Sequence, residues 1–347
     1  MQKPNDRVPR TQRAAGCLFG LAYGDALGAD TEFLSLDEIL RCYPPAGPHT
    51  LAATFPVRVT DDTQMALAVG EALLAAPRPY TVKTLEDPLR DAFIAWNESP
   101  ENNRAPGMTC IQACDYLACG LPWYKATISH SKGCGANMRV APVGLLQVGK
   151  DGVTTQSRAA IAQFQAALTH GHPTGLAAAD LTAYAIADLV DGGSPLDLPE
   201  RLIAYAQSQR TIYHHDWLGP LWRRSAAVKS PEAFIARGWD ECLLVLERLR
   251  LAVQKMDRQS DPCLATGAAW IAEEALATGL FCFLMYPEDP VAAIQRAATS
   301  SGDSDSIACL AGAFVGTHLG FAAWPADWLQ RIEYRQRLTR LADTLGA

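Results

Sequence analysis

The sequence predicts an all-α protein, folded as a single large orthogonal bundle of about a dozen or more helices. Apolar residues recur at intervals of three and four over long stretches, the spacing that places them on one face of a helix. Breakers rich in proline and glycine separate these stretches. The one strand-like run, 51–59, contains Pro56, which removes a backbone donor that a sheet would use.

The expected helices follow one another along the whole chain. After a glycine-rich first helix, the clearest periodic runs predict helices at 60–76, 174–190, 241–253, 266–285 and 305–321. Breakers lie at 43–50, 75–80, 97–107, 191–200 and 286–290. Because no repeat or linker divides the chain, we expect residues 14–347 to form one all-α domain. Residues 1–13 are polar and contain prolines, which predicts a flexible arm or a segment that folds back on the body.

Composition excludes several classes of protein. The 347 residues carry a net charge of -7 at pH 7, which gives no support to nucleic-acid binding. No apolar run reaches the roughly 18 residues of a membrane span, and the N-terminus lacks the apolar core of a signal peptide. We therefore expect a cytoplasmic protein without a membrane partner. The ten cysteines fit no zinc or iron–sulfur spacing and are expected to be reduced thiols.

Glycines recur at every fourth position of the first helix, at Gly16, Gly20, Gly24 and Gly28. They form a stripe without side chains, against which a neighbouring backbone can pack closely. Each glycine costs about 1 kcal/mol relative to alanine in a helix, so packing or ligand access must offset the loss. We expect this helix at the centre of the bundle, with Asp25 as a buried residue that ties helix ends together.

Two adjacent acids, Asp61 and Asp62, stand at the start of the helix predicted at 60–76. Thr60 or Asp61 is a suitable N-cap, and acids in a first turn interact favourably with the helix dipole. Taken alone, the segment is explained by helix initiation.

A second segment repeats this design: Asp303 and Asp305 precede another small-residue helix, which Ser306 opens. If the two segments converge, four carboxylates share a small volume. Two such charges about 4 Å apart repel by about 4 kcal/mol at an effective dielectric of 20, so cations or shifted pKa values must relieve them. Carboxylate and hydroxyl oxygens suit Mg²⁺ or Mn²⁺ rather than Zn²⁺. The pattern therefore favours a dinuclear metal site, on condition that the segments meet.

Two more segments offer polar groups. Glu32 follows the glycine-rich helix, either as a first-turn acid of the next element or as a carboxylate for acid–base work. Gly133 and Gly135 leave backbone N–H groups accessible, and Asn137 and Arg139 add donors for an anion such as a pyrophosphate. His170 and His172 precede a predicted helix and are explained by a helix-start loop with a polar cap. Their spacing of two could also make a metal pair, but no third ligand is evident.

Five motifs in this order resemble those of the ADP-ribosylglycohydrolase family: GDALGADTE, TDDTQMAL, GCGANMRVAPVGL, THGHP and GDSDSIACLAGAFVG. The resemblance runs from about Gly16 to Gly320. It implies an all-α fold, two Mg²⁺ ions (or Mn²⁺), and cleavage of the N- or O-glycosidic bond that joins ADP-ribose to a side chain or small molecule.

The resemblance also implies roles for particular residues. The implied metal ligands are Thr60, Asp61, Asp62, Asp303, Asp305 and Ser306. Glu32 matches the acid beside the scissile ribose, with Asp62 as the alternative base. The implied contacts to diphosphate, ribose and cleft are Gly133, Gly135, Ala136, Asn137, Met138, Arg139 and His170. Cys134 stands where the family commonly has Asn, and Ser306 where Thr is more usual.

The implied activity is Mg²⁺-dependent removal of ADP-ribose from a modified protein, most simply from arginine. Such a hydrolase reverses regulatory ADP-ribosylation or protects a cell from an ADP-ribosyltransferase toxin, which the N-terminal arm could also block. The alternatives are a catalytically idle protein that binds ADP-ribose or a toxin, or a hydrolase of another ADP-ribosyl linkage, to serine, a DNA base or a small molecule.

Overall fold

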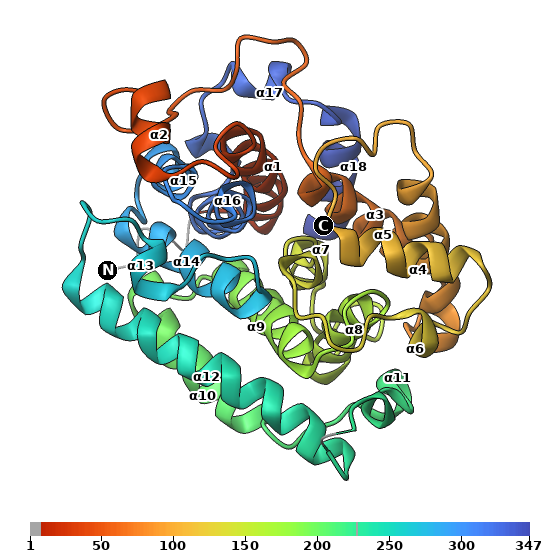
Figure 1. The fold of residues 1–347 in the computed structure, drawn as a ribbon. Coiled ribbons are helices and arrows are strands. Elements are labelled where there is room, and N and C mark those ends of the chain that lie inside the picture. The colour runs from red at the N-terminus through yellow and green to blue at the C-terminus, as the bar shows by residue number, and fades with distance from the viewer. Residues whose placement is uncertain (1–7, 227) are drawn as a thin grey trace.

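The computed structural model describes residues 8–226 and 228–347. This part of the chain is built from helices and contains no β-strand, only isolated bridges such as that between Val57 and Ile332. The helices cross at steep angles around a central pair, α1 and α16 (Figure 1). The predicted all-α bundle is confirmed, and the strand-like run at 51–59 is reduced to the single bridge at Val57.

The bounds of the helices are as follows. The first half contains α1 (Arg10–Gly28), α2 (Leu36–Cys42), α3 (Asp61–Ala75), α4 (Val82–Asn97), α5 (Met108–Ala118), α6 (Trp123–Ala126), the 3₁₀ turn η2 (Cys134–Ala136), α7 (Ala141–Gly144) and α8 (Thr155–Ala167). The second half contains α9 (Pro173–Val190), η3 (Pro195–Asp197), α10 (Leu198–Gln209), α11 (His215–Leu218), η4 (Leu221–Arg224), α12 (Pro231–Lys255), α13 (Cys263–Thr266), α14 (Ala272–Met285), α15 (Pro290–Ala298), α16 (Ser304–Leu319), η5 (Phe321–Ala323), α17 (Trp328–Arg331) and α18 (Arg335–Gly346).

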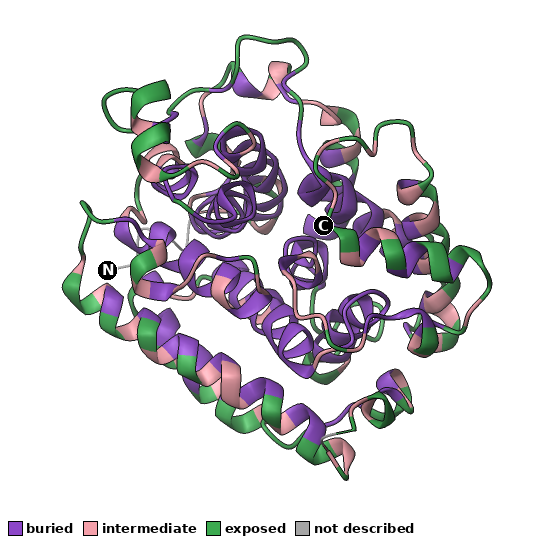
Figure 2. Cartoon of the chain, viewed as in Figure 1, coloured by how far each residue is buried: buried purple, intermediate pink, exposed green. Residues whose placement is uncertain are grey.

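The glycine stripe of α1 packs directly on the backbone of α16. A Cβ atom at Gly16 would lie 2.0 Å from the carbonyl oxygen of Gly316, and one at Gly24 would lie 1.9 Å from that of Ala308. The contact residues advance along α1 as they recede along α16, so the two helices run antiparallel. Both are buried on nearly every side, whereas α12 exposes one face (Figure 2). As expected, the glycine-rich helix lies at the centre.

The first helix, α1, begins inside the segment that was predicted to be a flexible arm or to fold back on the body. The helix begins at Arg10, and Arg13 is buried, with its guanidinium donating to the carbonyl oxygens of Leu189, Thr317 and His318. Residues 10–13 therefore belong to the folded body, because these carbonyls at the ends of α9 and α16 need a donor. The rest of the predicted arm includes residues 1–7, which lie outside the described part of the chain.

The remaining helices surround this pair and bring several turns to one region. The starts of α3 and α16, the turn after α1 and the η2 turn all lie beside a single cavity. Within the described residues, no helix combines the length and apolar character needed to cross a membrane.

Candidate active site

The two acidic segments meet at the first turns of α3 and α16. The hydroxyl of Ser306 donates a hydrogen bond to Oδ1 of Asp62 at 2.9 Å, although the two residues are far apart in sequence. Thr60 is the N-cap of α3, and its Oγ1 accepts from the backbone N–H of Asp62 at 3.3 Å. The convergence on which a metal site depends is therefore present in the structure.

Asp25 ties the end of α1 to the start of α3. Its carboxylate is fully buried and accepts hydrogen bonds from the backbone N–H groups of Thr60, at 3.0 Å, and Thr63, at 3.1 Å, and from the Thr63 hydroxyl. This is the structural role predicted for Asp25. It caps α3 from outside, which leaves Asp61 and Asp62 free to face the cavity.

Glu32 joins the acids of the second segment. Carboxylate oxygens of Glu32, Asp303 and Asp305 lie within 4.8 Å of one another. The turn between Gly28 and Glu32 is held against α16 by Thr31, whose Oγ1 lies 2.9 Å from the hydroxyl oxygen of Ser304. Packing of the glycine stripe therefore places the end of α1 beside the start of α16. Glu32, which follows the end of α1, lies beside Asp303 and Asp305 as a result.

Burial and mutual repulsion raise the pKa values of the whole acid set. Burial is the larger cause and the charge of Asp305 the next, and together they raise the pKa of Glu32 to about 8, that of Asp61 to about 8 and that of Asp25 to about 7. The same two causes hold the pKa of Asp62 well above its usual range. Positive charge would relieve this cluster, and divalent cations are the species that carboxylate and hydroxyl oxygens bind.

The acids face a cavity of about 350 Å³. Among the described residues that line it there is no lysine or arginine, so no side-chain cation offsets the carboxylates. The lining acids and hydroxyls are Glu32, Asp61, Asp62, Asp303, Asp305, Thr109 and Ser306. The donor set therefore fits hard divalent ions such as Mg²⁺ or Mn²⁺.

The glycine-rich turn forms another wall of the cavity. Gly133, Gly135 and Met138 line it. His170 closes the wall from behind: its Nδ1 lies 2.8 Å from Thr169 Oγ1, and its ring packs against both glycines. Burial, and then the charge of Arg139, keep the pKa of His170 well below its usual value, so the imidazole is neutral.

Cys134, which replaces the commoner Asn, also lines the cavity and is almost fully buried. Burial, and then the neighbouring charges of Asp303 and Asp62, raise the pKa of its thiol well above its usual value. A protonated thiol is a poor metal ligand, so Cys134 does not change the preference for hard cations.

Three residues that the resemblance implies as substrate contacts do not line this cavity. Ala136, Asn137 and Arg139 are fully buried and absent from its lining. Arg139 donates to the Gln165 side chain and backbone and to Thr169 Oγ1, and its guanidinium lies over the Phe93 ring. These interior acceptors satisfy the donors of Arg139 in this structure, so its contact with an anion stays a prediction. Arg139 supports His170 through the shared Thr169.

Two aromatic rings that line the cavity form a contact that was not predicted. The rings of Phe33 and Trp270 stack with centroids 5.5 Å apart and planes 19° apart, and both residues are exposed, Phe33 more than Trp270. Residues 105–109 form the adjoining wall. Trp270 and residues 105–109 lie in segments that also resemble the family. The contact of Phe33 with Trp270 depends on the tertiary fold, so the sequence did not predict it.

Fold and site together define an all-α protein with a carboxylate-rich cavity suited to divalent cations. Comparison with known proteins specifies the family. The family model described as ADP-ribosylglycohydrolase matches residues 6–347, and the chain belongs to this family. This confirms the resemblance and the expectation of an enzyme that hydrolyses glycosidic ADP-ribosyl bonds.

Relatives are distant but span the chain. An ADP-ribosylarginine hydrolase of Serratia proteamaculans is 25% identical, over 99% of this chain and 82% of its own length. The ADP-ribosyl dinitrogen reductase glycohydrolase of Rhodospirillum rubrum is 26% identical over 96% of both chains. A solved structure described as an ADP-ribosylglycohydrolase-related protein complex superposes with a TM-score of 0.64, at 25% identity and 97% coverage of each chain.

Proposed function

We propose that this chain is a Mg²⁺-dependent hydrolase that removes ADP-ribose from arginine side chains of modified proteins. The observation that carries the proposal is the make-up of one cavity: five carboxylates, two exposed aromatic rings and, among its described lining residues, no lysine or arginine. A guanidinium is attracted by aromatic faces, whereas a neutral serine linkage is not. Named relatives that act on ADP-ribosylarginine support this choice of linkage.

Two ions, Mg²⁺ or alternatively Mn²⁺, would be held by the oxygens of Thr60, Asp61, Asp62, Asp303, Asp305 and Ser306. Bound there, such cations supply positive charge that stabilises developing negative charge and lowers the pKa of water. The support for this ligand set is that five of the six line the cavity, whereas Thr60 does not line it but hydrogen bonds to Asp62.

Glu32 would act as the general acid or base of the hydrolysis. It is half-buried, whereas Asp61, Asp62, Asp303 and Asp305 are buried, so Glu32 has the freest access to a substrate. From this place beside the cavity, Glu32 would give a proton to the leaving nitrogen or take one from the attacking water. The C1″–N bond would break through an oxocarbenium-like state, and water would supply the new C1″–O bond. Asp62 is the second candidate for the base.

Gly133, Gly135, Met138 and the neutral His170 would form the wall that holds the diphosphate and ribose. Close packing requires a glycine at the second of these positions, since a Cβ at Gly135 would lie 2.7 Å from Cys110 Sγ and 2.9 Å from the His170 ring. The wall would fix the substrate relative to Glu32, which is the positioning contribution to the rate.

Removal of ADP-ribose would serve either to reverse endogenous regulation or to protect against an ADP-ribosyltransferase toxin. The Asp61→Ala variant separates catalysis from blocking of a toxin. Loss of protection in cells that carry this variant would mean that protection depends on hydrolysis, and retained protection would mean that it depends on binding.

The direct test is release of ADP-ribose from proteins modified on arginine or on serine, with Mg²⁺ and with a chelator. We expect release from ADP-ribosyl-arginine only, and only with Mg²⁺. The Asp62→Asn variant, which keeps the shape of the side chain, is expected to release none. Release from neither substrate by the wild type would overturn the proposal, and preferential release from serine would overturn the choice of linkage.

A further inference from the structure

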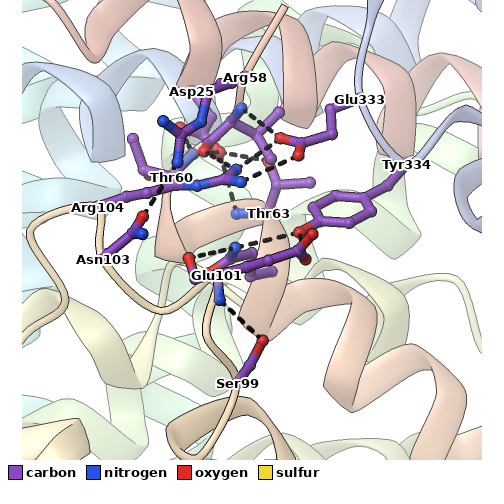
Figure 3. A network of polar contacts seen from close by, with 12 residues as sticks. Asp25, Arg58, Thr60, Thr63, Ser99, Glu101, Asn103, Arg104, Glu333 and Tyr334 are labelled. Atoms are coloured by element: carbon purple, nitrogen blue, oxygen red, sulfur yellow. Dashed lines mark hydrogen bonds and ion pairs between the residues drawn. The ribbon is translucent and has the colours of Figure 1, made fainter. Parts of the chain in front are cut away.

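An ion pair outside the cavity joins two distant segments beside the start of α3. Arg104 and Glu333 form a bidentate pair, with Nη1 2.6 Å from Oε2 and Nη2 3.0 Å from Oε1 (Figure 3). Their side chains are only 10% and 13% exposed. Two parallel charge-assisted hydrogen bonds fix the relative orientation of both side chains, which a single surface ion pair does not.

Both members of the pair also bind the backbone of Val59. Arg104 Nη1 donates to the Val59 carbonyl oxygen at 2.7 Å, and the Val59 N–H donates to Glu333 Oε2 at 3.2 Å. The Glu333 segment is itself anchored by the backbone hydrogen bonds of Val57, at 2.7 Å to the carbonyl of Arg331 and 3.0 Å from the N–H of Glu333. Both backbone polar groups of Val59, the N–H and the carbonyl oxygen, are therefore hydrogen bonded to the ion pair. Val59 directly precedes Thr60, the N-cap residue of α3.

Arg104 belongs to the segment that forms a wall of the cavity. Ala105, Pro106 and Gly107, which follow it, all line the cavity. The N–H of Gly107 donates to Oδ2 of Asp61 at 3.3 Å. The ion pair therefore acts on Asp61 from two sides. It fixes the backbone that precedes Asp61, and it also fixes the segment whose N–H hydrogen bonds to the Asp61 carboxylate.

We propose that Arg104 and Glu333 are positioning residues, which hold Thr60 and Asp61 and the wall at 105–107 in one arrangement and thereby set the cation affinity of the acid cluster. Neither residue lines the cavity, so both act through Val59 and Gly107. The effect on cation affinity rests on the proposed function. The effect on local order does not, and it can be measured without a cation.

The test compares Arg104→Lys with a matched control elsewhere. Lysine keeps the positive charge but loses the two-pronged contact. Arg201 makes the same kind of pair with Asp188, at 2.8 and 2.6 Å, and also donates to a carbonyl oxygen, that of Ser194, at 2.8 Å. None of these three residues lines the cavity, so Arg201→Lys reports the cost of losing such a pair without moving the site.

Two quantities are measured on the full chain: amide hydrogen exchange in chelator, and Mn²⁺ affinity by titration calorimetry. We expect Arg104→Lys to speed exchange in 57–63 and 98–107 and to weaken Mn²⁺ binding by about 10- to 100-fold. Glu333→Gln should do the same. Arg201→Lys should leave both quantities as in the wild type, even where its melting temperature falls by a similar amount.

Wild-type exchange in both segments of Arg104→Lys and Glu333→Gln would overturn the proposal. So would an equal loss of Mn²⁺ affinity in Arg201→Lys, since that would make the effect one of general stability. Failure of the proposed function looks different: the wild type itself would then neither bind Mn²⁺ nor release ADP-ribose, and the exchange measurement would still decide the role of the ion pair.

Discussion

Replacing Asp305 with asparagine is expected to stabilise the cation-free protein while abolishing hydrolysis. Asp305 is buried at the start of α16. Its charge contributes to the raised pKa of every other acid of the cluster, namely Asp25, Glu32, Asp61, Asp62 and Asp303. Asparagine keeps the shape of the side chain and removes that charge.

The magnitude follows from the separation of the carboxylates. Oxygens of Asp305, Glu32 and Asp303 lie within 4.8 Å, and a charged pair at that distance costs about 3.5 kcal/mol at an effective dielectric of 20. The folded protein avoids part of this cost by binding protons: the pKa of Asp61, for example, is about 8 instead of 3.8. We therefore expect the variant to gain about 1–3 kcal/mol at about pH 8 and almost nothing at about pH 4.

The sign of the pH dependence is fixed by these raised pKa values. Between about pH 4 and about pH 8 the folded cluster binds more protons than the unfolded chain, so the free energy of unfolding falls as pH rises through that window. Asp305→Asn should flatten this fall. With Mg²⁺ present the order should reverse, because the cation binds the wild-type cluster more tightly and stabilises its folded state.

Urea unfolding with a chelator and with Mg²⁺, at both ends of this pH window, measures the two effects. Hydrolysis of ADP-ribosyl-arginine is followed in parallel, with an expected loss of at least about 1000-fold. The reasoning is refuted if the variant is less stable than the wild type in chelator at about pH 8, or if it keeps Mg²⁺-dependent turnover.

Three further substitutions test separate parts of the molecule. Gly24→Ala places a Cβ 1.9 Å from the Ala308 carbonyl oxygen, so urea unfolding should show a loss of about 3 kcal/mol or more, whereas Gly107→Ala, which meets no atom within 4 Å, should cost far less. Trp270→Ala should raise KM for ADP-ribosyl-arginine proteins by about 10-fold through loss of the aromatic face, and equal changes for arginine and serine substrates would count against that role. Asp180 is fully buried, which raises the pKa of its carboxyl group to about 6. Ionisation of this group should therefore lower the free energy of unfolding as pH rises from about 4 to about 6. Asp180→Asn should remove that slope without changing turnover.

The helices and the acid cluster could be predicted because both depend on local pattern. The runs at 60–76 and 305–321 correspond to α3 and α16 within two residues, since three- and four-residue spacing defines a buried face wherever the helix lies. The acids were recognisable because two separate segments repeat one arrangement. The convergence of the two segments, by contrast, depends on the tertiary structure. The hydrogen bond between Ser306 and Asp62 shows it.

The directions of single side chains could not be predicted. Arg139 follows a glycine-rich turn, as an anion-binding arginine does, yet it points inward to Gln165 and Thr169. Residues 10–13 are polar, but Arg13 satisfies carbonyls that only the folded chain brings together. In each case the deciding partner is more than 20 residues away in sequence, where local spacing carries no information.

Asp61 and Asp62 can begin a helix and also act as metal ligands, because the two roles are compatible in this structure. The helix N-termini of α3 and α16 both face the cavity, and each carries partial positive charge that offsets some of the repulsion among the acids. The capping of α3 is done by Thr60 and Asp25, so the two aspartates need not use their oxygens for it. The glycine stripe of α1, costly as helix sequence, is what brings the end of that helix to the start of α16. The close packing of α1 on α16 therefore also holds the acids together at the cavity. For this reason, a methyl group at Gly24 should disturb both the packing of these helices and the acid cluster.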